Sequence, residues 1–278
     1  MSARVTTVVI SRDRWPDLQG SLPHHEPPVV LVDNGSRDGT PWHVGRAFPD
    51  VEVIALPHNL AAPARNLGVE AAGTPYVAFA DDDSWWAPGA LERAADLLDA
   101  HPRLAVVHAR ILVGPEERLD GLCARLADSP LPRTRELPGP AIVGFVACGA
   151  VVRREAFLEV GGFDAVVEFP GEEERVALDL VARGWDLAYV DDVVAHHHPS
   201  PVRDPGGHRR TRIVRNHLLT TLMRRPWPVV LREVGAVLHE RDLPAARGLV
   251  HAVRRSPRAL AARRVVPEHV EDLLALLS

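Results

Sequence analysis

The chain has 278 residues, of which 46% are hydrophobic and 25% charged, so it can bury a large core and is not a disordered protein. Its two cysteines, Cys123 and Cys148, exclude a scaffold held together by disulfides. The net charge of −5 is unevenly spread, because residues 1–202 carry 17 arginines and 30 acidic residues while residues 203–264 carry 15 and 4.

Short β-branched runs alternate with helix-length segments over the first hundred residues. Strands are predicted at 5–10, 29–32, 51–56 and 76–80, and helices at 40–48, 61–72 and 88–100. This alternation is typical of βαβ units and a mostly parallel sheet. The strands are nearly all apolar, which indicates that both faces of the sheet are covered.

The rest of the chain continues the sheet and then becomes helical. Strands are predicted at 105–113, 141–152, 187–190 and 193–196, helices at 153–160 and 172–183, and a long loop at 115–140 with one helical turn around 119–126. Helices follow at 211–224, 228–239, 245–254 and 267–277, separated by prolines that include Pro257. The pattern predicts a three-layer α/β/α sandwich over residues 1–205 and an arginine-rich helical segment over 206–278.

The first candidate site follows the second predicted strand, where Asp33 opens the sequence Asp-Asn-Gly-Ser-Arg-Asp-Gly-Thr. Ligands bind beyond the carboxyl ends of strands in open α/β sheets, and a carboxylate there can accept hydrogen bonds from a base or a ribose. The alternative is a tight turn with a helix N-cap, since Asp, Asn, Gly and Ser are ordinary turn residues.

Three consecutive aspartates, Asp81, Asp82 and Asp83, follow the fourth predicted strand. In an extended chain Asp81 and Asp83 project to the same side, where two carboxylates repel each other unless a cation lies between them. The alternative is that Asp83 or Ser84 caps the helix predicted from Pro88. A helix N-cap needs only one such side chain, so three consecutive aspartates favour a metal or phosphate site at this position.

Glu172 and Glu173 stand, with Glu174, at the start of the helix predicted at 172–183. A glutamate here could accept a proton from an acceptor hydroxyl, whereas the alternative is an acidic first turn, stabilised by the helix dipole by about 0.3–1 kcal/mol. The dipole lowers the pKa of such a carboxyl group and crowding by like charges raises it, so the protonation state stays open.

Two further clusters carry candidate ligands. His196, His197 and His198 end the last predicted strand, and in a persisting strand His196 and His198 share a face while His197 points away. Neutral imidazole suits Mn²⁺ better than Mg²⁺, although a packing role is the alternative for one of the three. Arg212 and Arg215, one helical turn apart, could clamp a diphosphate or an anionic headgroup, with a solvated charged face as the alternative.

These segments, in this order, resemble family 2 glycosyltransferases of the GT-A fold. The first block that carries the resemblance consists of residues 29–36 and 38–40, Asn59-Leu60, Ala64-Arg65-Asn66, Gly68, and Phe79 with the three aspartates. The later block consists of Ala147-Cys148-Gly149-Ala150, Arg153-Arg154, Gly161-Gly162-Phe163-Asp164, Gly171-Glu172-Glu173 and His196. The match covers about residues 4–200, and the segment after about residue 205 fits the family only loosely.

The resemblance implies a donor site for a nucleoside diphosphate sugar, within residues 1–100, and an acceptor half over 101–205. It places Asp33 at the nucleobase, Arg65 near the diphosphate, Asp81 near the ribose or the metal, and Asp82 and Arg12 as further donor contacts. It implies that Asp83 and Asp81, with His196 or His198, hold Mn²⁺ or Mg²⁺. Glu173, preceded by Glu172, stands where the family usually has the aspartate that serves as catalytic base.

Three departures from the family pattern stand out. Ser11-Arg12-Asp13-Arg14 replaces the usual Thr-Tyr-Asn-Arg, which affects the contacts to the nucleobase. Glu in place of Asp lengthens the base at position 173 by one methylene group. Arg175 and Asp179 stand where Asp and Arg are more usual, which predicts a swapped ion pair between residues i and i+4.

The function that the resemblance implies is metal-assisted transfer of a hexosyl or deoxyhexosyl group to an acceptor hydroxyl, with inversion at the anomeric carbon. The alternatives are a nucleotidyltransferase, against which the absence of lysine and of a glycine-rich loop after the first strand argues, and a non-catalytic nucleotide-sugar-binding protein. The expected acceptor is a lipid-linked or cell-envelope glycan precursor.

Location and partners follow from the charge pattern and from the hydrophobic runs. No apolar run reaches the about 18–20 residues that cross a bilayer, and the first residues lack a signal-peptide core, so a cytoplasmic protein is expected. The basic segment at 203–264 predicts peripheral contact with an anionic membrane. No nucleic acid partner is expected, because the segment contains no recognisable nucleic-acid-binding module.

Overall fold

Strand residues point alternately into two apolar layers, which is why the strands are nearly all apolar. In β1 (Val5–Ser11), Val8 packs into one hydrophobic cluster and its neighbour Val9 into the cluster on the opposite face. In β2 (Val29–Asp33), Val30 and Leu31 divide between the same two clusters. Side chains of successive strand residues point to opposite faces, so both faces of this sheet need a helical cover.

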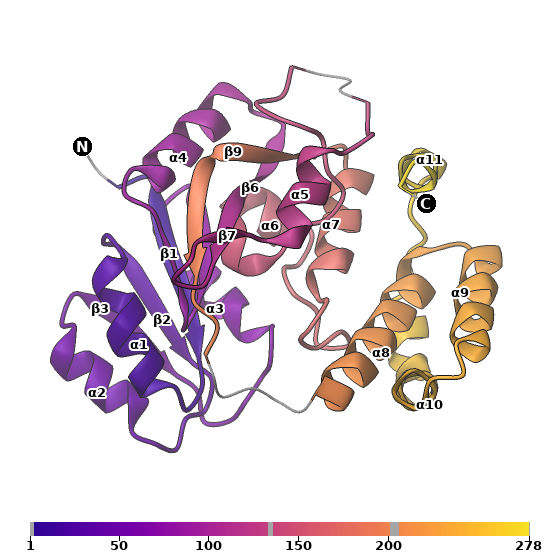
Figure 1. The fold of residues 1–278 in the computed structure, drawn as a ribbon, viewed down its shortest axis with the longest axis horizontal. Helices are drawn as coiled ribbons and strands as arrows, with labels where there is room; N and C mark the ends of the chain where they lie inside the picture. The colour runs from indigo at the N-terminus through magenta and orange to yellow at the C-terminus, as the bar shows by residue number, and fades with distance from the viewer. Residues whose placement is uncertain (1–2, 133–135, 201–205, 278) are drawn as a thin grey trace.

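This computed structural model describes residues 3–132, 136–200 and 206–277, and within them one nine-stranded sheet has the order β3-β2-β1-β4-β8-β6-β9-β5, with β7 on β6 (Figure 1). The other strands are β3 (Val51–Ala55), β4 (Tyr76–Asp81), β5 (Ser84–Trp86), β6 (Leu104–Val113), β7 (Arg118–Leu119), β8 (Ala150–Arg153) and β9 (Asp186–His197). The β1–β2, β2–β3, β1–β4 and β6–β9 pairs are parallel, whereas β8 is antiparallel to both neighbours. The longest ladders are parallel, which confirms the prediction of a mostly parallel sheet.

Helices cover both faces and complete the three-layer α/β/α sandwich that the sequence predicts. One face carries α1 (Trp15–Ser21), α2 (Thr40–Ala47) and α4 (Ala90–Ala100), and the other carries α3 (Ala64–Ala71), α6 (Arg154–Glu159) and α7 (Glu173–Ala182). Shorter pieces are η1 (Leu22–His24), α5 (Gly121–Ala127) and η2 (Ala147–Gly149). Gly68 brings α3 close to β1, because a Cβ there would lie 2.4 Å from Val8 Cγ1.

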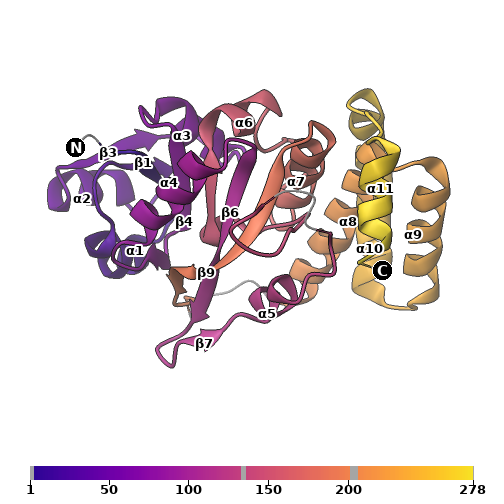
Figure 2. The same cartoon turned by 90° about the horizontal axis from the view of Figure 1, so that it is seen from above.

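The C-terminal helices are α8 (Gly206–Arg224), α9 (Trp227–His239), α10 (Leu243–Ala261) and α11 (Glu268–Ala275). They lie together on the α7 side of the molecule (Figures 1 and 2). Helices α8 and α10 share a hydrophobic cluster with Val167, and Val266 and Val270 belong to the main core cluster of the sheet. The helical segment is therefore packed on the sandwich through two apolar contacts.

The predicted strand at 141–152 is wrong over most of its length. Of this segment only β8 forms a strand, and Ala141 forms a single bridge to Ala188. Ile142, Val143 and Phe145 nevertheless lie in the main core cluster. An apolar run can be buried by an irregular chain as well as by a strand, and periodicity does not separate these cases.

Other boundaries also differ from the predictions. Helix α1 was not predicted, although Pro16 and Asp17 in its first turn are helix-start signals. The two strands predicted at 187–190 and 193–196 form the single strand β9, whose irregularity places Asp191 and Asp192 in exposed ion pairs with Arg110 and Arg93.

Pro257 does not separate two helices as predicted but lies inside α10. A proline within a helix removes the hydrogen bond to the carbonyl group four residues earlier. The hydroxyl group of Ser256 donates to that carbonyl, Val253 O, at 2.8 Å. This local replacement explains how the helix continues to Ala261.

Candidate active site

Asp33 lies at the carboxyl end of β2, directly beside Ser11 at the end of β1. One carboxylate oxygen of Asp33 accepts a hydrogen bond from the Ser36 N–H at 3.0 Å, which is the turn role that the sequence left as the alternative. Within the described residues, the other oxygen and the Ser11 hydroxyl are buried and have no hydrogen-bond partner. Buried polar atoms without partners are costly, so this pair favours a bound ligand with matching donors and acceptors.

Arg65 joins the two acidic motifs of the chain. From the start of α3, its guanidinium donates to Asp81 Oδ1 at 2.6 Å and to Glu172 Oε1 at 3.1 Å. Against the effect of burial, these two carboxylates raise the pKa of Arg65 and keep it charged. The carboxyl end of β4 and the first turn of α7 therefore meet at one place, as the sequence predicts.

Glu172 and Glu173 are both buried at the N-terminus of α7. The backbone N–H of Ala147 donates to Glu173 Oε1 at 3.1 Å. Burial, followed by the charge of Glu172, raises the pKa of Glu173 to about 8. The competition that the sequence left open is thus decided by desolvation and crowding, which outweigh the helix dipole.

Asp83 contacts a histidine, but it is His197. The Nε2 atom of His197 lies 3.3 Å from Asp83 Oδ1, and the backbone N–H of Ser200 donates to Asp83 Oδ2 at 2.9 Å. Against the effect of burial, these hydrogen bonds lower the pKa of Asp83. Burial and the charges of Asp81 and Asp83 raise the pKa of Asp82 to about 8.

The register of β5 explains why His197 takes this place. Ser84 pairs with His197 in an antiparallel ladder, so the His197 side chain lies on the same face as Ser84, opposite to the face of Trp85. The backbone N–H of His198 donates to Asp83 O at 2.8 Å, which holds this end of β9 beside Asp83. His196 and His198 do share a face, as predicted, but that face lies on the Trp85 ring, at centroid distances of 5.5 and 4.6 Å. His196 Nδ1 also lies 2.8 Å from Glu117 Oε1.

The capping alternative for the aspartates is wrong. Helix α4 begins at Ala90 with Gly89 at its N-cap, and Ser84 belongs to β5. Within residues 3–132, 136–200 and 206–277, no group of three or more His, Cys, Asp and Glu side chains is arranged as a complete metal site. Asp83 and His197 nevertheless provide an oxygen and a nitrogen ligand of the kind that Mn²⁺ accepts.

The remaining predicted residues lie after the end of β1 and on α8. Arg12 is partly exposed at the end of β1, 3.6 Å from Asp13. Arg215 is buried on α8 and forms an ion pair with Glu168 at 3.1 Å, so it is not part of a solvated face. Arg212 lies one turn earlier on the same helix.

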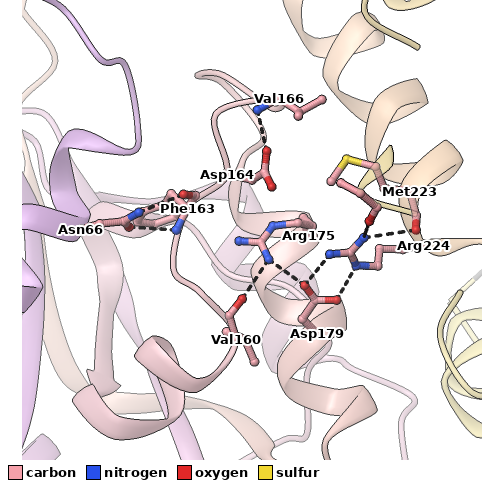
Figure 3. A network of polar contacts seen from close by, with 10 residues as sticks. Asn66, Val160, Phe163, Asp164, Val166, Arg175, Asp179, Met223 and Arg224 are labelled. Carbon is pink, nitrogen blue, oxygen red and sulfur yellow. Dashed lines mark hydrogen bonds and ion pairs between the residues drawn. The ribbon is translucent and has the colours of Figure 1, made fainter. Parts of the chain in front are cut away.

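A polar network holds α7 against α8 (Figure 3). The predicted swapped pair is confirmed, because Arg175 donates to Asp179 Oδ2 at 2.6 Å. Arg224 of α8 reaches both oxygens of the same carboxylate. On the other side of the acidic turn, the Asn216 side chain donates to the carbonyl groups of Glu168 and Pro170.

Sequence reasoning did not assign His197, Ser11 or Asn216 to the site. The signal for His197 was its position beside two candidate ligands, but its orientation depends on β5, which was not predicted. A polar Asn at the centre of the predicted helix 211–224 was the signal for Asn216. Ser11 departs from the family pattern, and nothing in the sequence indicates that its hydroxyl group is buried beside Asp33.

Comparison with known proteins extends these observations. Residues 19–161 match the family described as Glycosyl transferase family 2. The N-acetylglucosaminyl-diphospho-decaprenol L-rhamnosyltransferase of Mycobacterium tuberculosis is 29% identical over 214 residues, which cover 65% of this chain and 70% of the relative. The pre-mycofactocin glycosyltransferase of the same organism is 32% identical over 185 residues, 63% of this chain and 38% of the relative.

Two solved structures are similar in fold. The mannosyltransferase PcManGT from Pyrobaculum calidifontis, in complex with GDP-Man and Mn²⁺, has a TM-score of 0.62 at 19% identity and covers 99% of this chain and 86% of its own. TarS of S. aureus, residues 1–349 in complex with UDP-GlcNAc, has a TM-score of 0.60 at 16% identity and covers 98% and 84%. The GT-A sandwich, the acidic centre joined by Arg65, and a family match over half of the chain lead to one conclusion: this chain belongs to glycosyl transferase family 2 and is a glycosyltransferase with the GT-A fold.

Proposed function

We propose that the chain transfers a hexosyl or deoxyhexosyl group from a nucleoside diphosphate sugar to an acceptor hydroxyl in a single inverting displacement. The observation that carries this proposal is the Arg65 bridge, which joins Asp81 at the end of β4 to Glu172, the neighbour of Glu173. A donor held by the aspartates after β4 would thus be close to a base at the start of α7.

The donor would bind across the ends of β1, β2 and β4. The Asp33 oxygen and the Ser11 hydroxyl that have no partner in the described part of the chain would provide an acceptor and a donor for the edge of a nucleobase. Arg12, Asp81 and Asp82 are proposed as further donor contacts. Arg65 has both terminal nitrogens committed to carboxylates, so a direct contact between it and the diphosphate requires one of these ion pairs to open.

A divalent cation, Mn²⁺ or Mg²⁺, is part of the proposal, because Asp83 and His197 form an incomplete ligand set that donor phosphates and water could complete. When bound, it would neutralise the charge that develops on the leaving diphosphate. Asp81 would be the second carboxylate ligand. His196 and His198, which pack on Trp85, would shape the wall beside this site.

Glu173 would serve as the general base. In its ionised form it would take the proton of the acceptor hydroxyl while the hydroxyl oxygen attacks the anomeric carbon and the bond to the diphosphate breaks. Glu172 is committed to Arg65, which leaves one carboxylate to activate the attacking group. A single activating carboxylate supports one displacement and therefore inversion.

The acceptor is proposed to be a lipid-linked glycan precursor. The relative that acts on an N-acetylglucosaminyl-diphospho-decaprenol supports this class of acceptor. The excess of arginine over residues 203–264 also supports an anionic acceptor carried at a membrane surface, and hence a peripheral location at its inner face. Arg212 would lie on the acceptor side of the site, since its neighbour Arg215 pairs with Glu168 just ahead of the acidic turn.

The test is an assay of nucleoside diphosphate release, with Mn²⁺ and a panel of nucleotide sugars and polyprenyl diphosphate sugars, on the wild type and Glu173→Gln. General-base help is typically worth 10²–10⁴-fold, so the variant should lose at least about 100-fold in kcat. Donor binding, measured by calorimetry, should stay within about threefold, because the donor contacts are elsewhere.

Glu174→Gln is the matched control, since Glu174 is in the same helical turn but contacts His217 on α8. It should keep kcat within about threefold of the wild type. Near-normal turnover in Glu173→Gln would remove Glu173 from the mechanism, and a retained anomeric configuration in the product would contradict the single displacement.

A further inference from the structure

Helix α10 packs with its smallest residues inward. Its buried positions are Ala245, Gly248, Ala252 and Ala259. A Cβ at Gly248 would lie 2.8 Å from Thr211 O and 2.9 Å from Val214 Cβ, so α8 and α10 are too close there for any larger residue. The Thr211 hydroxyl also donates to Pro244 O at 3.0 Å. These contacts fix the rotation of α10 about its own axis.

The large apolar residues of α10 consequently face solvent. The exposed fractions are 62% for Leu243, 50% for Val250, 63% for Val253 and 45% for Leu260. Separations of seven, three and seven residues place these side chains on one face of a helix with 3.6 residues per turn. We call this row the α10 stripe. An amphipathic helix normally buries such a row in the core, so the α10 stripe indicates a further binding partner.

A row of arginines runs beside the α10 stripe. Arg247, Arg254 and Arg258 are exposed, and α10 contains no acidic residue from Leu243 to Ala261. Within residues 3–132, 136–200 and 206–277 these three arginines form no ion pair, in contrast to Arg255, which turns inward to Glu168. The exposed surface of α10 is therefore both apolar and cationic.

The neighbouring helix α9 repeats the apolar part of this pattern. Trp227, Leu231 and Leu238 are more than half exposed and are separated by four and seven residues, again on one helix face. Tryptophan and leucine together with arginine are the residues that amphipathic helices place at the boundary between lipid headgroups and acyl chains.

We propose that the α10 stripe and its arginine row bind the surface of an anionic lipid bilayer, with α10 lying in the plane of the interface. The charge of α10 favours an anionic bilayer over a second copy of the chain as the partner. A symmetric contact between two copies through α10 would bring two arginine rows together, and these would repel each other. Among the helices of the described residues, none is long and apolar enough to span a membrane. Binding on the surface is the mode that the amphipathic pattern of α10 supports.

Because α10 packs on α8 and α8 packs on α7, the orientation of α10 on a bilayer would also fix the orientation of the active site. Arg224 of α8 pairs with Asp179 of α7, and the first turn of α7 carries Glu172 and Glu173. A bilayer bound to α10 would therefore hold the acidic site at one distance from the membrane surface. This consequence rests on the proposed function, whereas membrane binding itself does not.

The test is co-sedimentation of the full chain with vesicles of phosphatidylcholine alone and with 30 mol% phosphatidylglycerol, at ~50 mM salt and without any sugar donor. Partitioning should be at least about tenfold stronger on the anionic vesicles and should fall with salt. Val250→Gln with Val253→Gln should weaken it about tenfold by removing apolar area. Arg254→Gln with Arg258→Gln should weaken it by about 10–30-fold on anionic vesicles only.

Arg118→Gln with Leu119→Gln is the control, because it replaces one arginine and one aliphatic residue by glutamine at exposed positions of β7. It should bind within about twofold of the wild type. Unchanged thermal midpoints would show that the variants are folded, and light scattering reports the oligomeric state. The proposal would be overturned if the protein did not sediment with vesicles, or if it bound neutral and anionic vesicles equally. It would also be overturned if both α10 variants bound like the wild type, or if light scattering showed a dimer that the Val250 and Val253 substitutions dissociate.

Because no donor, metal or turnover enters this assay, it separates membrane binding from catalysis. A protein that binds vesicles but is inactive would refute the proposed function alone. A protein that transfers sugar but does not bind vesicles would refute the membrane surface and the peripheral location proposed above, and would leave the glycosyl transfer itself supported.

Discussion

The surroundings of the Glu173 carboxyl group favour two different protonation states. Burial and the adjacent Glu172 favour the neutral form, whereas the N–H of Ala147 and the charge of Arg65 favour the ionised form. The first pair dominates and raises the pKa to about 8. A base with this pKa is only partly ionised at neutral pH, but it is a stronger proton acceptor than an ordinary glutamate.

This pKa has a consequence for stability that can be measured. A carboxyl group with a raised folded-state pKa binds its proton more tightly in the folded protein, so stability falls as pH rises from about 4.5 to about 8. Glutamine mimics the protonated form at every pH. We therefore expect Glu173→Gln to match the wild type in thermal midpoint near pH 4.5 and to exceed it by several degrees at pH 8.5, since each kcal/mol corresponds to about 2–4 °C.

The measurement is a pair of thermal unfolding series in the presence of a chelator. A difference between the two proteins that stays constant from pH 4.5 to pH 8.5 would show that the pKa of Glu173 is not raised. If the wild type instead became more stable than the variant as the pH rises, the pKa of Glu173 would be lowered in the folded protein and not raised.

At the scale of elements, helix α7 is positioned by side chains at its N-terminus and in its second turn. Glu172 at its N-cap meets Arg65, and the second turn carries Asp179, which accepts hydrogen bonds from Arg175 of the same helix and from Arg224 of α8. All three side chains of this second contact are largely buried. Buried ion pairs cost desolvation energy but are strongly destabilising when one partner is removed.

We expect Arg224→Gln to lower the free energy of unfolding by about 3 kcal/mol, because Asp179 loses its bidentate partner while remaining buried. Urea unfolding measures this change. Arg232→Gln on α9 is the control, since Arg232 forms an exposed pair with Glu233 and should cost less than about 0.5 kcal/mol. Equal effects of the two substitutions would contradict a docking role for Arg224.

At the scale of the whole molecule, the helical segment at 206–278 shares its contacts with the sandwich. Val266 and Val270 belong to the main core, Val167 belongs to the cluster of α8 and α10, and Arg255 pairs with Glu168. The division at about residue 205 is proposed as a boundary along the chain. These shared clusters indicate that the two parts stabilise one another.

The full chain should therefore unfold in one cooperative transition. Scanning calorimetry should give a calorimetric enthalpy equal to the van't Hoff enthalpy, because neither part can lose the shared clusters without exposing the other. Two separate transitions, of which one is abolished by deleting the helical segment, would show that the parts are independent.

Local patterns in the sequence were sufficient to predict which candidate residues stand at the ends of elements. Asp33, the aspartates after β4 and the glutamates at the start of α7 stand at ends of elements, and such ends are visible from the switch between apolar runs and polar residues. The sandwich itself follows from strands that are apolar on both faces. These features depend on residues close together in the chain.

The tertiary structure alone decided the features that depend on a distant neighbour. His197 rather than His196 or His198 faces Asp83, because the unpredicted strand β5 sets the register of the end of β9. The pKa of Glu173 follows from burial beneath segments that lie far away in sequence, and the rotation of α10 follows from close packing against Thr211. Periodicity shows that a helix has two faces, but only the neighbouring surface determines which face is buried.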